Sequence, residues 1–139
     1  MEHQDQGPAD GIIPHLTIRD NRAAEAIDFY TAAFGAEETG RHMADDGQRI
    51  MHAHLKLNGG QLMLNDHFTE FGNPAGEPGG STLHLQVKDA DAAWQRALDA
   101  GATEKFPLAD QFWGDRYGQV TDPFGFSWSI GAPLGAPPD

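Results

Sequence analysis

The stretch HLTIRD at residues 15–20 returns as HLQVKD at residues 84–89, which is 69 residues further along the chain. An alanine pair follows each copy at the same distance, at 23–24 and at 92–93. Each copy begins with alternating apolar and polar residues, as in a half-buried strand, and then enters an alanine-rich segment with helical spacing. The repeat therefore predicts that one strand-helix unit is built twice.

Further signals extend this unit in both halves of the chain. We expect a first helix over 21–34 ending at Gly35 and a second over 90–100 ending at Gly101, because glycine is favoured just beyond a helix C-terminus. Turn sequences such as Asn58-Gly59 separate short alternating segments after each helix. These segments predict strands near 37–44, 49–57 and 61–66, and near 102–107, 116–121 and 126–131. The predicted order is strand, helix and three strands, twice over.

The length of 139 residues suits one ordinary domain, because domains most often have about 100–150 residues. Both ends of the chain are polar or rich in Pro and Gly, which is typical of tails. The segment 67–80 has two prolines and four glycines, which favours a linker. We expect a single domain over 11–131, with module one at 11–66, the linker at 67–80, module two at 81–131, and tails at 1–10 and 132–139.

Charge and composition exclude several classes of function. The chain has 9 Lys and Arg against 21 Asp and Glu, a formal net charge of −12, which disfavours nucleic acid and anionic membranes as partners. It has no cysteine, so a metal would be held by histidine, carboxylate or water. No segment has the ~20 consecutive apolar residues of a membrane span, and no signal peptide is recognisable. We expect a cytoplasmic protein without a membrane partner.

Strand alternation predicts which side chains face away from the helices. Leu16 and Ile18 are expected to face the helices, as are Met51, Ala53 and Leu55 of the strand at 49–57. The opposite face is then rich in hydrogen-bonding groups and imidazoles, which is consistent with a binding site or with a solvated sheet face. The residues expected on this face are His15, Thr17, Arg19, His52, His54, Lys56, Gln61, Met63, Asn65, Thr82, His84, Gln86, Ser127 and Ser129.

A dense aromatic and polar cluster occupies 113–119. Arg116 could bind a carboxylate or phosphate through its guanidinium, or it could form an ion pair on the surface. Regular alternation places Arg116 on the face opposite Tyr117 and Gln119, whereas the glycines at 114 and 118 would permit a bulge that changes this direction. Trp113 could form a stacking platform for a ligand.

The chain resembles the vicinal oxygen chelate superfamily, which includes glyoxalase I, bleomycin resistance proteins and extradiol dioxygenases. The repeat carries this resemblance over 11–131, together with the motifs IDFY at 27–30, FGA at 34–36 and DPFG at 122–125. The motifs IPHL at 13–16, FGAE at 34–37 and WGDRYG at 113–118 are similar to the PhnB-like subgroup. The resemblance implies an α+β fold in which two βαβββ modules form one cupped, mostly antiparallel eight-stranded sheet with the helices on its outer face. It also implies a homodimer.

Metal enzymes of this superfamily hold a divalent ion at four positions, on the first and last strand of each module. The resemblance places His15 and Met63 at the two positions of module one. In module two it places Ser129 at one position and either Thr82 or His84 at the other. Two imidazoles without a carboxylate fall short of the three protein ligands of a catalytic site, so no metal cofactor is expected. If a divalent metal binds, His15 and His84 would be its ligands, with His54 as a possible third.

Two functions are consistent with these residues. The first is binding of a small organic ligand in the sheet cup without a catalytic metal. The alternative is a metal-dependent lyase, isomerase or dioxygenase; His15 and His84 could also serve as an acid-base pair. An acidic cup would suit a cationic drug, whereas an inward Arg116 would favour an anion. The candidate ligand-binding residues are His15, His54, Met63, Asn65, Thr82, His84, Trp113, Arg116, Gln119 and Ser129.

Overall fold

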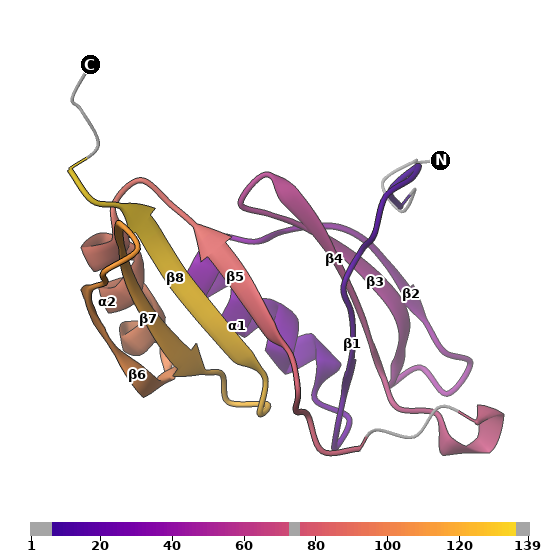
Figure 1. Cartoon of the computed structure of the whole chain (residues 1–139). Helices are drawn as coiled ribbons and strands as arrows, with labels where there is room; N and C mark the ends of the chain where they lie inside the picture. The colour runs from indigo at the N-terminus through magenta and orange to yellow at the C-terminus, as the bar shows by residue number, and fades with distance from the viewer. Residues whose placement is uncertain (1–6, 73–75, 136–139) are drawn as a thin grey trace. The chain divides into compact units, whose positions relative to one another are not determined.

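The structure is a computed structural model that describes residues 7–72 and 76–135. The chain divides into two compact units, Met1–Glu77 and Pro78–Asp139, and each unit contains one strand-helix-strand-strand-strand module (Figure 1). Module one consists of β1 (His15–Ile18), α1 (Ala23–Phe34), β2 (Glu37–Met43), β3 (Ile50–Leu57) and β4 (Gly60–Asp66), followed by the 3₁₀ turn η1 (Thr69–Phe71). Module two consists of β5 (Thr82–Gln86), α2 (Ala90–Ala100), β6 (Thr103–Asp110), β7 (Asp115–Thr121) and β8 (Ser127–Pro133).

The two modules share one strand topology. The strand order is β1-β4-β3-β2 in the first sheet and β5-β8-β7-β6 in the second. In each sheet the first strand pairs parallel to the last strand, and the other neighbours are antiparallel. The predicted α+β fold of two βαβββ modules is confirmed. The eight strands are hydrogen-bonded as two sheets of four, in which β1 and β5 are edge strands.

Helix ends follow local signals in both modules. Gly35 adopts a left-handed conformation with φ 75° and donates its N–H to the carbonyl of Thr31, which ends α1 as predicted. α1 begins two residues later than expected, because Asp20 and Asn21 also adopt left-handed φ values of 62° and 58°. α2 has the predicted bounds, and the Asp89 side chain caps it by accepting a hydrogen bond from the N–H of Ala92.

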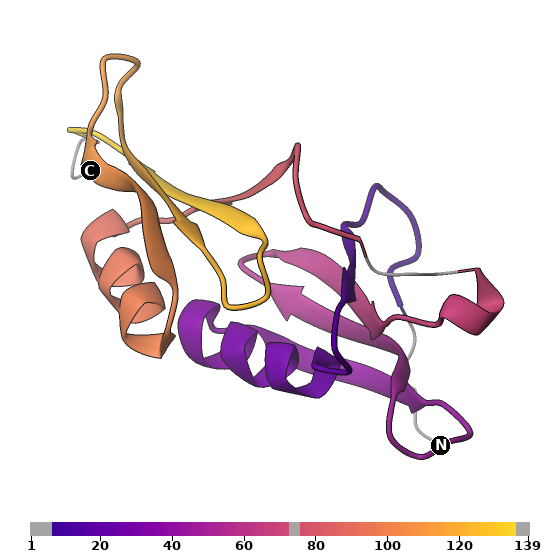
Figure 2. The same cartoon turned by 90° about the horizontal axis from the view of Figure 1, so that it is seen from below.

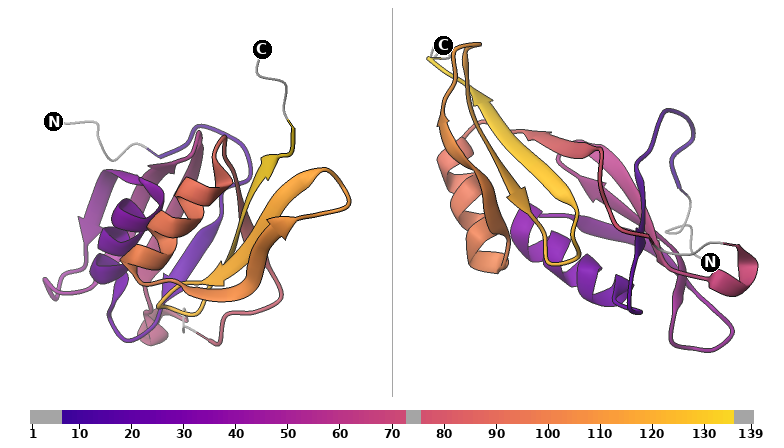
Figure 3. Two further views of the ribbon diagram at one scale, coloured as in Figure 1. Left: turned by 90° about the vertical axis from the view of Figure 1, so that its left-hand side faces the viewer. Right: turned by 60° about the horizontal axis from the view of Figure 1, so that its bottom comes forward.

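Each helix covers one face of its own sheet. In module one, α1 lies along the sheet and contacts all four strands (Figure 2). The helix residues Ile27 and Tyr30 are buried. In module two, α2 lies along β6, β7 and β8, with Trp94 and Ala97 buried (Figure 3). The opposite face of each sheet is left to polar side chains. No helix within residues 7–72 and 76–135 is long and apolar enough to cross a membrane.

A bulge in β3 reverses one predicted orientation. We expected Met51 on the helix-facing side, but its side chain is 43% exposed and Ile50 is buried instead. The pairing between β2 and β3 shifts here, from His42 opposite His52 to Met43 opposite Ile50. A bulge inserts one residue into the strand and so changes the phase of alternation at that point.

Two buried aspartates tie the loops to the sheets. The Asp66 carboxylate accepts hydrogen bonds from the backbone N–H of Ala23 at 2.9 Å and of Ile50 at 2.7 Å, and thus joins the start of α1 to the start of β3. In module two, Asp122 accepts from the indole N–H of Trp128 and from two backbone N–H groups of the turn that follows it. Both carboxylates satisfy donors that would otherwise be buried without a partner.

We predict that Asp66→Ala lowers the free energy of unfolding by roughly 3 kcal/mol, because it leaves two buried backbone donors unsatisfied. Urea unfolding measures this loss. Asp89→Ala is the control, because it removes a hydrogen bond from an exposed helix cap and should cost about 1 kcal/mol. Equal losses in the two variants would contradict the role assigned to Asp66.

We also predict that Gly118→Ala is strongly destabilising in module two. A Cβ at Gly118 would lie 2.7 Å from both the Leu108 Cα and a ring carbon of Trp94, and the backbone atom cannot move independently of β6. The matched control is Gly60→Ala, whose Cβ would have the Leu57 carbonyl oxygen at an ordinary 3.6 Å. Thermal unfolding should show a large drop in Tm for the first variant and little change for the second.

Candidate functional site

Corresponding rows of side chains cross the open faces of the two sheets. In the first sheet, His15 on β1 is opposite Met63 on β4, and Met63 is opposite His54 on β3. In the second sheet the same pairings align His84, Ser129 and Gln119. Thr82, the other candidate on β5, is opposite Ser127.

The open face of module one gathers four imidazoles, which we term the histidine cluster: His15, His42, His52 and His54. The ring of His52 lies 4.4 Å from the ring of His54 and 5.8 Å from that of His15, measured between centroids, in edge-to-face orientations. His42 is directly opposite His52 in the pairing of β2 with β3. His15 and His54 were candidates from the sequence, whereas His52, at the centre of the cluster, was not.

His54 is the buried member of this cluster. Its side chain is only 5% exposed, and Gly7 lies against it, since a Cβ at Gly7 would be 3.0 Å from Cε1 of the ring. Thr39 Oγ1 donates a hydrogen bond to the His54 carbonyl at 3.2 Å. Further along the face, Thr17 Oγ1 donates to Oδ1 of the buried Asn65 at 3.1 Å.

The surroundings of His52 disfavour its protonation. Burial lowers the pKa of His52 below its usual value of 6.5, and the positive charges that His54, His15 and His42 would carry lower it further. Its ring is therefore neutral at neutral pH, which is the form that accepts a hydrogen bond or binds a metal ion.

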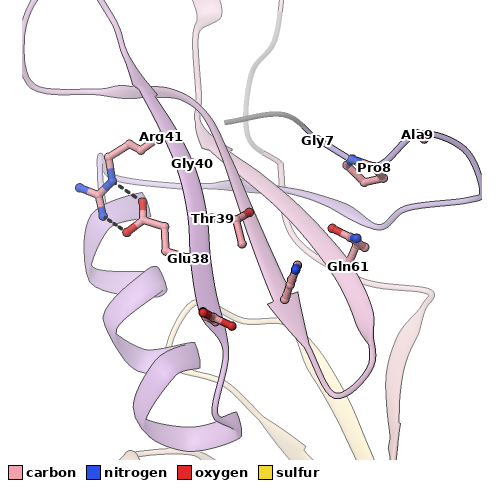
Figure 4. Close-up of a pocket in the computed structure, with 10 residues that line it drawn as sticks. Gly7, Pro8, Ala9, Glu38, Thr39, Gly40, Arg41 and Gln61 are labelled. Atoms are coloured by element: carbon pink, nitrogen blue, oxygen red, sulfur yellow. Dashed lines mark hydrogen bonds and ion pairs between the residues drawn. The ribbon is translucent and has the colours of Figure 1, made fainter. Parts of the chain in front are cut away.

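A pocket of about 880 Å³ opens beside the cluster (Figure 4). Glu38 and Arg41 form an ion pair at 2.6 Å on one side of β2, and Gln61 and Pro8 lie on the other side. None of the candidate ligand-binding residues predicted from the sequence lines this pocket. Its lining comes from Gly7, Pro8, Ala9, Glu37, Glu38, Thr39, Gly40, Arg41, Lys56 and Gln61.

In module two, the open face carries a hydrogen-bonded network around His84. The Nδ1 atom of His84 lies 2.7 Å from Ser129 Oγ, and its Nε2 atom lies 2.7 Å from Gln86 Oε1. A carbonyl oxygen can only accept, so Nε2 donates to Gln86; in the neutral ring Nδ1 then accepts a hydrogen bond from the Ser129 hydroxyl. Both ring nitrogens of His84 are thereby engaged.

Aromatic side chains border this network. The Tyr117 ring stacks on the His84 ring at 5.8 Å, and Gln119 Nε2 donates to the Tyr117 hydroxyl at 3.0 Å. Trp113 packs edge-on against Tyr117 at 5.4 Å and remains 49% exposed. Tyr117 therefore links three of the candidates, although it was not one itself; its alternation with Gln119 along the strand is the signal that could have found it.

The remaining candidates of module two lie at different places. Thr82 shares a hydrogen bond of 3.1 Å with Ser127, which also accepts one from Lys105 Nζ, at the start of β5 and β8. Arg116 lies on the opposite face of the sheet, where it forms ion pairs with Asp91 of α2 and with Asp110. These two carboxylates determine the direction of Arg116, as regular alternation predicted, and separate it from Tyr117 and Gln119.

The four positions at which the metal enzymes of this fold hold an ion do not fit a catalytic divalent metal. By the resemblance they carry the imidazole of His15, the thioether of Met63, the hydroxyl of Ser129 and either the imidazole of His84 or the hydroxyl of Thr82, without a carboxylate. Hard divalent ions are held by oxygen ligands, above all by negatively charged carboxylates. Both ring nitrogens of His84 already have hydrogen-bond partners. Within the described ranges, no three His, Asp or Glu side chains are already arranged to hold an ion.

Comparison with known proteins identifies relatives over almost the whole chain. The model of the Glyoxalase/Bleomycin resistance protein/Dioxygenase superfamily matches residues 12–130. The uncharacterized protein Rv0887c of Mycobacterium tuberculosis is 49% identical over 144 residues, covering 95% of this chain and 83% of that protein. The uncharacterized protein At5g48480 of Arabidopsis thaliana is 31% identical over 121 residues, covering 81% of this chain and 73% of that protein.

Solved structures show the same fold. The X-ray structure of the At5g48480 product covers 87% of this chain and 97% of its own, with a TM-score of 0.71. The structure of PA1353 from Pseudomonas aeruginosa is 26% identical and covers 91% of this chain and 99% of its own, also with a TM-score of 0.71. TioX from Micromonospora sp. ML1 is 28% identical, covers 89% of this chain and 100% of its own, and has a TM-score of 0.67.

Proposed function

The chain belongs to the Glyoxalase/Bleomycin resistance protein/Dioxygenase superfamily, and from this premise we propose that it binds a small organic ligand without a catalytic metal. The observation that carries the proposal is the hydrogen-bonded network around His84 on the open face of module two. Its polar groups stand beside exposed aromatic surface, which is the combination that small-molecule sites use to fix orientation and to gain contact area.

Each part of this face has a distinct task in the proposed site. Gln119 offers hydrogen-bonding groups, and the buried Ser129 holds His84 in place through their 2.7 Å contact. Tyr117 and the half-exposed Trp113 offer rings on which a planar ligand can stack. Arg116 has no part in this site, because its guanidinium is paired with carboxylates on the helix-facing side. The proposed ligand is accordingly not an anion clamped by Arg116.

The metal-dependent alternative has less support. A lyase, isomerase or dioxygenase of this superfamily would need ligands at the four family positions, and here these offer at most two imidazoles, besides a thioether and hydroxyl groups. His84 would have to give up a hydrogen bond of 2.7 Å to coordinate an ion. We therefore assign no chemical step to a metal at those positions.

We extend the proposal to the organisation of the protein. The match over residues 12–130 supports a single functional domain over 11–131, formed by the two modules and the linker at 67–80. The motif at 113–118 supports a place in the PhnB-like subgroup. We propose a homodimer that works in the cytoplasm, for which the net charge of −12 provides solubility.

The test is a binding screen on metal-free protein kept in EDTA, using planar aromatic compounds with hydrogen-bonding groups and the cationic drug bleomycin. We predict that hits raise Tm and that Tyr117→Leu and His84→Ala each weaken their affinity roughly tenfold in calorimetry, because these variants remove central contacts. Arg116→Gln is the matched control, since it alters the opposite face of the same strand and should bind like the wild type.

Two results would overturn the proposal. One is binding that survives both open-face variants while their circular dichroism shows an intact fold. The other is binding that EDTA abolishes and added divalent ion restores, which would favour the metal-dependent alternative.

A further inference from the structure

The proposed ligand site on module two leaves the histidine cluster of module one without a role. His52 and His54 are separated by one residue on β3, so their side chains project from the same face of the strand. This i, i+2 spacing of two imidazoles is confined to module one: the positions of β7 that correspond to β3 hold Gln119 in place of His54. The cluster is therefore a feature of one module and not of the repeat.

The distance between the two rings is just below that of a chelating pair. An imidazole nitrogen binds Zn²⁺ at ~2.0–2.1 Å, which places two adjacent rings on one ion with centroids about 4.5–5.5 Å apart. The rings of His52 and His54 are 4.4 Å apart at an interplanar angle of 82°. The His15 ring, 5.8 Å from that of His52, lies only slightly beyond this range.

We propose that His52 and His54 form a two-imidazole chelate for a borderline divalent ion such as Cu²⁺, Ni²⁺ or Zn²⁺, with His15 as the third imidazole within reach. Imidazole suits these ions and not Mg²⁺ or Ca²⁺, which prefer oxygen ligands. A chelate of two imidazoles is consistent with the absence, within the described residues, of a group of three side chains already arranged to hold an ion. Water completes the coordination, so the site binds weakly and reversibly.

The chelating pair His52 and His54 lies outside the metal positions of the fold family, whereas the third imidazole, His15, occupies one of them. The pair consists of two neighbouring residues of β3, neither of which lies on the first or last strand of a module. Gly7 lies against the ring of His54, so its backbone amide reports on an ion bound to that ring.

The experiment is a calorimetric titration of the untagged full chain with Ni²⁺ and with Zn²⁺. We predict that His52→Ala and His54→Ala each weaken metal binding by about tenfold or more. Even the loss of a residue that only supports a metal ligand commonly lowers metal affinity on this scale. His15→Ala should weaken it less. His84→Ala and His67→Ala are the controls, because these histidines lie outside the cluster, and they should leave the affinity unchanged.

An NMR measurement locates the ion directly. Substoichiometric Cu²⁺ should broaden the side-chain ¹⁵N signals of His52, His54 and His15, together with the amide signal of Gly7, before the side-chain signal of His84. Binding that both β3 variants retain while folded, or broadening that starts at His84, would refute the site. Neither result bears on the organic ligand, whose binding is measured in EDTA.

Discussion

The strand register is the constraint on which both modules depend. In each sheet the first strand pairs parallel to the last, with His15 opposite Met63 in module one and His84 opposite Ser129 in module two. Because side chains alternate along a paired strand, this register commits one face to the helix and sends the polar side chains to the other. A slip by one residue would bury the imidazoles under the helix, so folding itself excludes the alternative pairing. The open faces therefore exist because the apolar faces must be covered.

The same backbone carries different chemistry in its two copies. In module one, the aligned positions across the open face carry an imidazole, a thioether and an imidazole. In module two, the corresponding positions carry an imidazole, a hydroxyl and an amide, with Gln119 at the place of His54. In module two the hydroxyl and amide engage His84 and Tyr117 in a satisfied network, which leaves no imidazole nitrogen for a metal. In module one the imidazole rings meet edge to face. The two modules thus present equivalent faces that differ in their side chains at a few register positions.

The sequence predicts what depends on local pattern and misses what depends on distant contacts. The repeat and the glycine signals predicted both modules and the bounds of α2. Met51 was assigned to the wrong face because a bulge depends on how β2 and β3 pair, which alternation within one strand does not encode. The contact of Gly7 with His54 joins segments that are 47 residues apart and show no common pattern. The prominence of His52 was missed for the same reason, because its ring neighbours come from two strands.

The most direct test of the central claim, that the open face of module two holds the ligand, is chemical-shift mapping on metal-free protein with a compound from the binding screen. We expect the largest chemical-shift changes at Tyr117, Gln119 and Ser129. The signals of Arg116 and Trp94, on the helix-facing side, should change little. Shifts concentrated around Arg116 and α2, or shifts that arise only after a divalent ion is added, would contradict this claim.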